Sequence, residues 1–99
     1  MTKSELAAKM QENQAWLPGK RVKLDFGDNG VIMLDGAGES VSEDDGDADT
    51  TIKIGWDDWQ AMADGQLDGM TAFMTGKLKV EGDMSNAMQL QGVLSKLRG

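Results

Sequence analysis

The chain has 99 residues, 39% hydrophobic and 27% charged, which predicts one compact domain over residues 1–99. Ten Lys and Arg stand against 17 Asp and Glu, so the formal net charge of −7 argues against nonspecific binding of nucleic acid. The absence of Cys and His excludes disulfides, thiolate or imidazole metal ligands, and nucleophiles activated by imidazole. No apolar run approaches the roughly 20 residues of a membrane span, so we expect a soluble, cytoplasmic protein.

The spacing of apolar residues predicts both strands and helices. Strict alternation over 21–26 is typical of a half-buried strand, and the apolar run 31–34 fits the second arm of a hairpin. In chain order, the predicted elements are a helix capped by Thr2 or Ser4 and running to about Trp16, strands over 21–26, 31–34, 39–43 and 50–54, helices from Asp57 to Gly65 and from Asp68 to Gly76, a strand over 77–81, and a final helix after Asp83. Because each strand has one apolar face and each helix one apolar stripe, the sequence predicts a two-layer α+β fold with helices on one side of a sheet.

Two adjacent acidic residues, Asp57 and Asp58, admit two interpretations. A general acid and base pair needs both side chains to converge on one substrate, whereas neighbours on a helix diverge by roughly 100°. We therefore favour a capping role, in which Asp57 and Gln60 form a capping box at the start of a helix. A hydrolase that depends on this acid pair is the least supported function.

Acidic residues are concentrated between residues 25 and 68. Asp45, Asp47 and Asp49 have the spacing of the first ligands of a calcium-binding loop. However, Thr50 stands where that loop needs Gly, and Trp56 stands where it needs a bidentate Glu. We therefore expect no metal site and interpret the acidic stretch as a solvated face, whereas the two ends of the chain are mildly basic.

Methionine and tryptophan supply most of the large apolar side chains. The chain has eight Met and three Trp but only two Phe and no Tyr. Five of the eight Met lie between residues 62 and 88, on the predicted helices. Met is flexible and repacks easily, so such residues either fill a core or line a pocket that accepts varied apolar guests. Composition leaves both interpretations open.

Four segments in the second half of the chain form a specific series of motifs. They are 49–54 (DTTIKI), 58–59 (DW), 62–65 (MADG) and 72–84 (AFMTGKLKVEGDM). In this series the chain resembles the sterol carrier protein 2 family, over residues 49–96. The first half fits that family only as a helix followed by a hairpin.

The resemblance implies a two-layer α/β domain in which helices cover a five-stranded sheet, with an apolar tunnel between them. It also implies noncatalytic binding or transfer of a fatty acid, fatty acyl-CoA, phospholipid or sterol, so we expect no enzyme activity and no cofactor. By this resemblance the candidate tunnel lining comprises Ile54, Trp56, Trp59, Met62, Met70, Phe73, Met74, Met84, Met88 and Leu94. The simpler interpretation is that the same side chains fill the core.

The expected partner is a lipid or acyl-chain ligand, with transient membrane contact and a monomeric or weakly dimeric chain. A charged head group would lie at the tunnel mouth, within reach of Lys77, Lys79 or Lys96. The alternative is a small interaction or dimerisation module with a filled core that docks on a partner protein. Its basis is the short chain and the expected exposure of Trp16 and Trp56.

Overall fold

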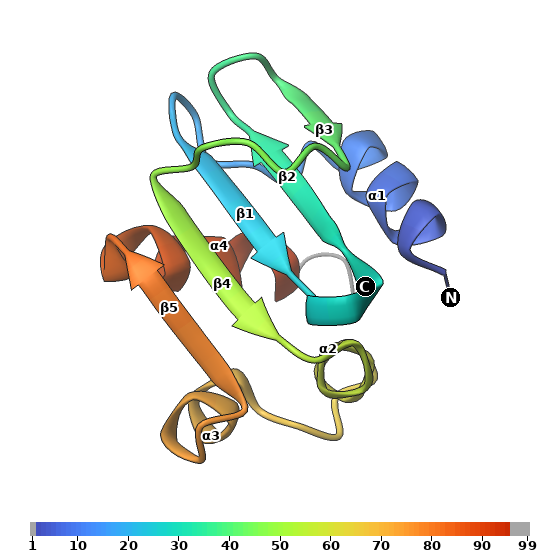
Figure 1. The fold of residues 1–99 in the computed structure, drawn as a ribbon, viewed down its shortest axis with the longest axis vertical. Helices are drawn as coiled ribbons and strands as arrows, with labels where there is room; N and C mark the ends of the chain where they lie inside the picture. The colour runs from blue at the N-terminus through green and yellow to red at the C-terminus, as the bar shows by residue number, and fades with distance from the viewer. Residues whose placement is uncertain (1, 96–99) are drawn as a thin grey trace.

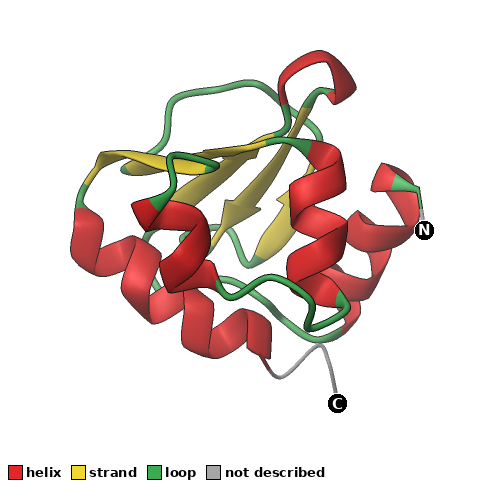
Figure 2. Ribbon diagram, turned by 90° about the horizontal axis from the view of Figure 1, so that it is seen from below, coloured by secondary structure: helices red, strands yellow, loops and turns green. Residues whose placement is uncertain are grey.

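Five strands form one mixed sheet, and the α-helices lie against one face of it (Figures 1 and 2). The structure is a computed structural model that describes residues 2–95. Its elements are α1 (Lys3–Glu12), β1 (Arg21–Asp25), a 3-10 turn (Gly27–Asn29), β2 (Val31–Asp35), β3 (Ser40–Ser42), β4 (Thr50–Ile54), α2 (Trp56–Ala63), α3 (Gly69–Met74), β5 (Leu78–Gly82) and α4 (Met84–Ser95). The predicted two-layer α+β fold is confirmed.

The strands are ordered β3-β2-β1-β4-β5, so β3 and β5 are the edges of the sheet. β1 pairs antiparallel with β2 and parallel with β4, and this register places Leu24 beside both Ile32 and Ile52. β5 pairs antiparallel with β4, with Val80 opposite Ile52. Within the described residues no strand lies beyond β5, and Figure 1 shows it along the open side of the sheet.

The core lies between the inner face of the sheet and the helices. Because side chains alternate along a strand, every second residue of β1, β2 and β4 points into this layer. The buried apolar residues of the core are Leu6, Met10, Ala15, Leu17, Val22, Leu24, Phe26, Ile32, Leu34, Ile52, Ile54, Trp59, Ala72, Leu78, Ala87 and Leu90. β5 contributes only Leu78 to this set, so the core is thinner toward the β5 edge.

Helix α1 begins as predicted but ends earlier. The Thr2 hydroxyl accepts a hydrogen bond from the Glu5 N–H, and the Glu5 carboxylate accepts one from the Thr2 N–H, which completes a capping box. The carboxylate bonds hold the pKa of Glu5 below its ordinary value. The predicted extension to Trp16 is wrong, because Asn13 caps the helix and Gln14 adopts a left-handed φ of 53°.

The sequence predicts the N-terminal cap of α3 correctly but not that of α2. The expected Asp57 and Gln60 capping box is wrong, because Gly55 occupies the N-cap of α2 and makes no side-chain bond there. Asp57 and Asp58 instead lie in the first turn, where the helix dipole favours negative charge. Asp68 does cap α3, since its carboxylate accepts hydrogen bonds from two backbone N–H groups of the first turn.

The acidic loop 43–49 crosses the outer face of the sheet on its way from β3 to β4 (Figure 1). Lys23 of β1 donates hydrogen bonds to the Asp45 carboxylate at 2.8 Å and to the Gly46 carbonyl at 3.0 Å. Met33, which points to this outer face, is only 5% exposed. The loop is therefore solvated on one side only and also covers part of the sheet.

Candidate functional site

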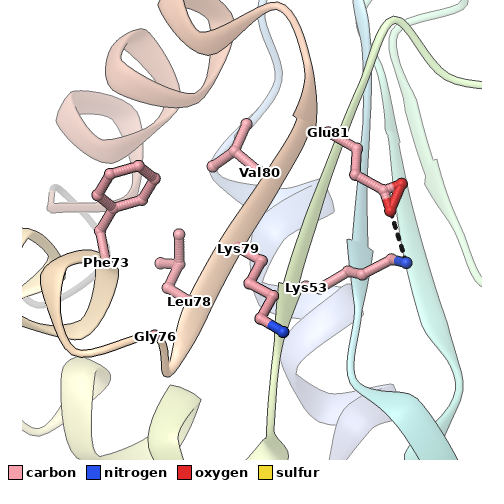
Figure 3. A pocket seen from close by; sticks show the side chains of 7 residues that line it. All are labelled: Lys53, Phe73, Gly76, Leu78, Lys79, Val80 and Glu81. Atoms are coloured by element: carbon pink, nitrogen blue, oxygen red, sulfur yellow. Dashed lines mark ion pairs between the residues drawn. The ribbon is translucent and has the colours of Figure 1, made fainter.

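An open groove of about 600 Å³ follows β5 at the edge of the sheet (Figure 3). Phe73 of α3 and the β5 residues Leu78 and Val80 lie on the helix side of the strand. The charged residues that line the groove lie on the opposite side of the strand in Figure 3. The complete lining is Lys53, Phe73, Gly76, Leu78, Lys79, Val80 and Glu81. The groove thus has an apolar wall and a charged rim.

The alternation of β5 creates this two-sided lining. Leu78 and Val80 point toward the helices, whereas Lys79 and Glu81 point away, because successive side chains of a strand face opposite sides. Leu78 is buried and Val80 is half-buried. Val80 is less covered because it lies on an edge strand at the thin end of the core.

Helix α3 places Phe73 beside β5. Asp68 fixes its start by accepting hydrogen bonds from the backbone N–H groups of Met70 at 3.0 Å and Thr71 at 3.2 Å. Gly76, with a left-handed φ of 80°, allows the tight reversal into β5. The short helix and the tight turn together hold Phe73 on the apolar wall (Figure 3).

A buried polar pair fixes α4 against β4. The Thr50 hydroxyl donates to the Asp83 carbonyl at 2.9 Å and accepts from the Asn86 side-chain amide at 3.1 Å. Thr50 is 1% exposed and Asn86 is 4% exposed. The Asp83 carboxylate accepts bonds from the hydroxyl and the N–H of Ser85, which lower the pKa of Asp83. These contacts hold one face of α4 against the core and leave Met84 and Met88 exposed.

The charged rim contains one ion pair and further lysines. Lys53 contacts the Glu81 carboxylate at 2.6 Å, and this contact raises the pKa of Lys53. Lys79 lies beside Lys53 in the β4–β5 register, and Lys77 is exposed in the turn before β5. Of the three lysines expected near a head group, Lys79 lines the groove, whereas Lys96 lies outside the described residues.

The ten residues of the predicted lining fall into three groups. Ile54 and Trp59 belong to the buried core, and Trp56 and Met62 are half-buried against it. Five are exposed to 41% or more of their surface, namely Met70 (57%), Phe73 (41%), Met74 (78%), Met84 (42%) and Met88 (64%). Leu94 belongs to α4, but its side chain lies outside the described residues.

The groove brings together only one residue of that lining, Phe73. Alternation over 77–81 predicts that Leu78 and Val80 face inward, but it does not predict that they line a groove. The signal that identifies them is the position of β5 at the edge, which depends on the strand order. The ten-residue tunnel lining stays a prediction.

The two tryptophans that motivated a docking module are not exposed. Trp16 and Trp56 both pack partly buried against the core. Trp56 also meets the ring of Phe26 edge-on, with 5.1 Å between ring centroids, and Trp59 contacts the same ring at 5.7 Å. The expected exposure of Trp16 and Trp56 is therefore wrong, and the docking module loses its main support.

Neither a metal cluster nor a spanning helix occurs in the part of the chain that the structure describes. Over residues 2–95, no three Asp or Glu side chains are grouped so that they could hold a metal ion. No helix in the same range is both long and apolar enough to cross a bilayer. A ligand in the groove would therefore contact an apolar wall and, beside it, a rim of ammonium and carboxylate groups.

Comparison with known proteins identifies clear relatives. The sequence profile of the SCP-2 sterol transfer family matches residues 4–95. Sterol carrier protein 2 of Bos taurus is 39% identical over 63 residues, which are 64% of this chain and 12% of that protein. A fatty acid-binding protein of Yarrowia lipolytica is 39% identical over 49 residues, which are 50% of this chain and 38% of that protein.

A solved structure has a similar fold. The solution structure of a sterol carrier protein 2 from Aedes aegypti, in complex with the C16 fatty acid palmitate, superimposes with a TM-score of 0.74 at 19% identity. The match covers 92% of each chain. By contrast, this chain spans only 12% and 38% of the two proteins matched by sequence.

Proposed function

The chain belongs to the SCP-2 sterol transfer family, and from this premise we propose that it binds an acyl-chain lipid without chemically changing it. The apolar tail lies against the wall formed by Phe73, Leu78 and Val80, between α3, β5 and α4. The head group remains near water at the charged rim. Residues 1–99 act as a single lipid-binding domain.

The observation that carries this proposal is the group of exposed apolar residues on α3 and α4. Large apolar side chains that are exposed singly are ordinary on protein surfaces, whereas a group of them marks a binding surface. Three of these exposed residues lie on α3 and two on α4, and both helices lie on the same face of the sheet (Figures 2 and 3). An apolar ligand would remove this surface from water.

The energetics suit a lipid with few polar requirements. An acyl chain of about 15 methylenes, at roughly 0.8 kcal/mol per buried CH₂, offers about 12 kcal/mol before association and ordering costs are subtracted. Exposed Met side chains adapt to different chain lengths and degrees of unsaturation. The proposal therefore includes broad selectivity among acyl chains.

The rim supports an anionic head group. Lys79 and Lys53 place two ammonium groups beside the groove, and only Glu81 among the lining residues opposes them. A fatty acid carboxylate would be attracted to this pair of lysines at the surface. The proposed lining also includes Trp56 and Met62, which pack half-buried against the core.

The relatives support a fatty acid as the first ligand to test. The Yarrowia lipolytica relative is named for fatty acid binding, and the Aedes aegypti structure contains palmitate. A sterol or a phospholipid would use the same apolar wall, so the ligand class is defined by its tail.

Titration with a fluorescent fatty acid tests the proposal, together with native mass spectrometry of the purified chain and extraction of any bound lipid. We expect saturable binding in the micromolar range, which corresponds to about 8 kcal/mol. No saturable binding at tens of micromolar, with no lipid extracted, would refute the proposal.

A matched pair of variants localises the binding. Val80 of β5 and Val41 of β3 are both half-buried valines on edge strands, at opposite edges of the sheet. Val80→Asp should abolish binding because it places a charge on the apolar wall, whereas Val41→Asp should retain it. Circular dichroism checks that both variants fold. Equal loss of binding in two folded variants would place the ligand elsewhere.

A further inference from the structure

Strand β5 leaves one side of its backbone without a neighbouring strand. Its only strand partner in the described part of the chain is β4, with which it pairs from Leu78 to Gly82. Figure 1 shows no strand along its outer side, with α3 and α4 at its two ends. The N–H and C=O groups on that side are a template for another strand.

The charges of β5 are arranged symmetrically with opposite sign about Val80. Lys79 precedes Val80 and Glu81 follows it, and both are exposed on the outer face of the sheet. The pattern continues beyond the strand, with Lys77 on one side and Asp83 on the other. We propose that β5 pairs antiparallel with β5 of a second copy of this chain, about a two-fold axis at Val80.

This register turns the symmetric pattern into complementary contacts. Lys79 lies opposite Glu81 of the second copy, and by symmetry Glu81 lies opposite Lys79 of the second copy. A parallel in-register pairing would instead place like charges side by side. The pattern therefore favours the antiparallel pairing and disfavours the parallel one.

The same register brings exposed apolar residues together. An antiparallel partner places the α3 end of one β5 beside the α4 end of the other, because α3 precedes β5 and α4 follows it. Phe73 and Met74 of one copy then face Met84 and Met88 of the other, and all four are exposed in the single chain. Pairing would cover this surface from both copies at once.

A second copy fits this edge better than a lipid bilayer does. Hydrocarbon offers no partner for the free backbone groups of an edge strand, so an open edge is not tolerated there. Another β5 supplies both the hydrogen-bond partners and the opposite charges. Edge lysines often prevent such pairing, but here each lysine has a carboxylate opposite it in the antiparallel register.

The pairing does not depend on lipid. The pairing rests on the open edge of β5 and on the charges of that strand. One consequence, that the second copy closes the groove over a bound lipid, rests on the proposed function. Because Val80 lines the groove and lies on the axis, each copy would form part of the lid of the other groove. The two proposals can fail separately, since one is tested by mass and the other by ligand titration.

Analytical ultracentrifugation at low ionic strength tests the pairing. We expect the mass to rise from the 10.7 kDa of one chain toward twice that value between about 10 µM and about 1 mM. Lys79→Glu and Glu81→Lys each place like charges opposite one another at both symmetric contacts. Each variant should weaken dimerisation by roughly tenfold or more.

Three further samples distinguish this register from a general effect of charge. The double variant Lys79→Glu/Glu81→Lys restores opposite charges and should dimerise again. An equimolar mixture of the two single variants should form a mixed dimer, because every contact then joins Glu to Lys. Lys9→Glu on α1, which packs near the opposite edge strand β3, is the charge-matched control and should dimerise normally.

The outcomes separate clearly. A wild-type chain that stays monomeric at about 1 mM overturns the proposal. The proposal is also overturned if the single variants dimerise like the wild type, or if the mixture of the two single variants shows no more dimer than each variant shows alone. A wild-type chain that dimerises but does not bind the fluorescent fatty acid would support the pairing and overturn the lipid proposal, whereas a wild-type monomer that binds it would do the reverse.

Discussion

Truncation of Phe73 to alanine removes the aromatic part of the apolar wall. Phe73 is 41% exposed. A phenylalanine covers roughly 200 Å² when buried, so about 80 Å² of this ring is free to contact a ligand. At about 25 cal/mol per Å², the lost contact is worth about 2 kcal/mol, or roughly a 30-fold increase in Kd. The covered remainder of the ring sets an upper limit of about 3 kcal/mol on the loss of stability.

Fatty acid titration and thermal unfolding of the same preparations separate these two effects. Phe73→Met keeps an apolar side chain at the wall and should retain most of the affinity. Thr71→Ala changes an exposed residue of the same helix that does not line the groove, and it should bind like the wild type. A folded Phe73→Ala chain whose Kd stays within about threefold of the wild type would refute the assignment of this wall to the ligand.

Two further predictions concern the attachment of α4. Thr50→Val removes both hydrogen bonds of a buried hydroxyl and leaves the Asn86 amide unpaired. Urea unfolding should therefore show that the free energy of unfolding falls by about 1–3 kcal/mol. A decrease below about 0.5 kcal/mol would contradict this account. Because bonds from Ser85 lower the pKa of Asp83, the folded chain binds this proton less readily than the unfolded chain. The stabilisation is present above the ordinary carboxyl pKa of about 4 and is lost as pH falls through the lowered value, so the difference in stability between wild type and Asp83→Asn should shrink from about pH 6 to about pH 3. A constant difference would show that Asp83 does not act through its charge.

Local signals in the sequence predict most of the elements. Alternation fixes β4 at Thr50–Ile54, and Asp68 with Gly76 brackets α3 as expected. The failures come from competing local contacts. Asn13 ends α1 well before Pro18, which is the stop that the sequence predicts, because the Asn13 side chain donates to the carbonyl of Lys9. Nothing in the spacing distinguishes a helix that starts at Trp56 from one that starts a residue later.

The candidate site is less predictable than the fold. Helical spacing shows that Met70, Phe73 and Met74 share a face, but it does not show what covers that face. Ala72, a small residue, is the one that α3 buries in the core, and the larger side chains remain exposed. The groove depends on β5 being an edge strand, and strand order follows from tertiary pairing rather than from any local pattern.

The central claim is that an acyl chain lies along the β5 edge. A photoreactive palmitate analogue, activated on the bound protein and mapped by peptide mass spectrometry, tests this most directly. We predict saturable labelling in residues 69–95, centred on Phe73, Val80 and Met88, that unlabelled palmitate abolishes. Labelling confined to α1 or to the acidic loop 43–49, or labelling that palmitate does not displace, would contradict the account.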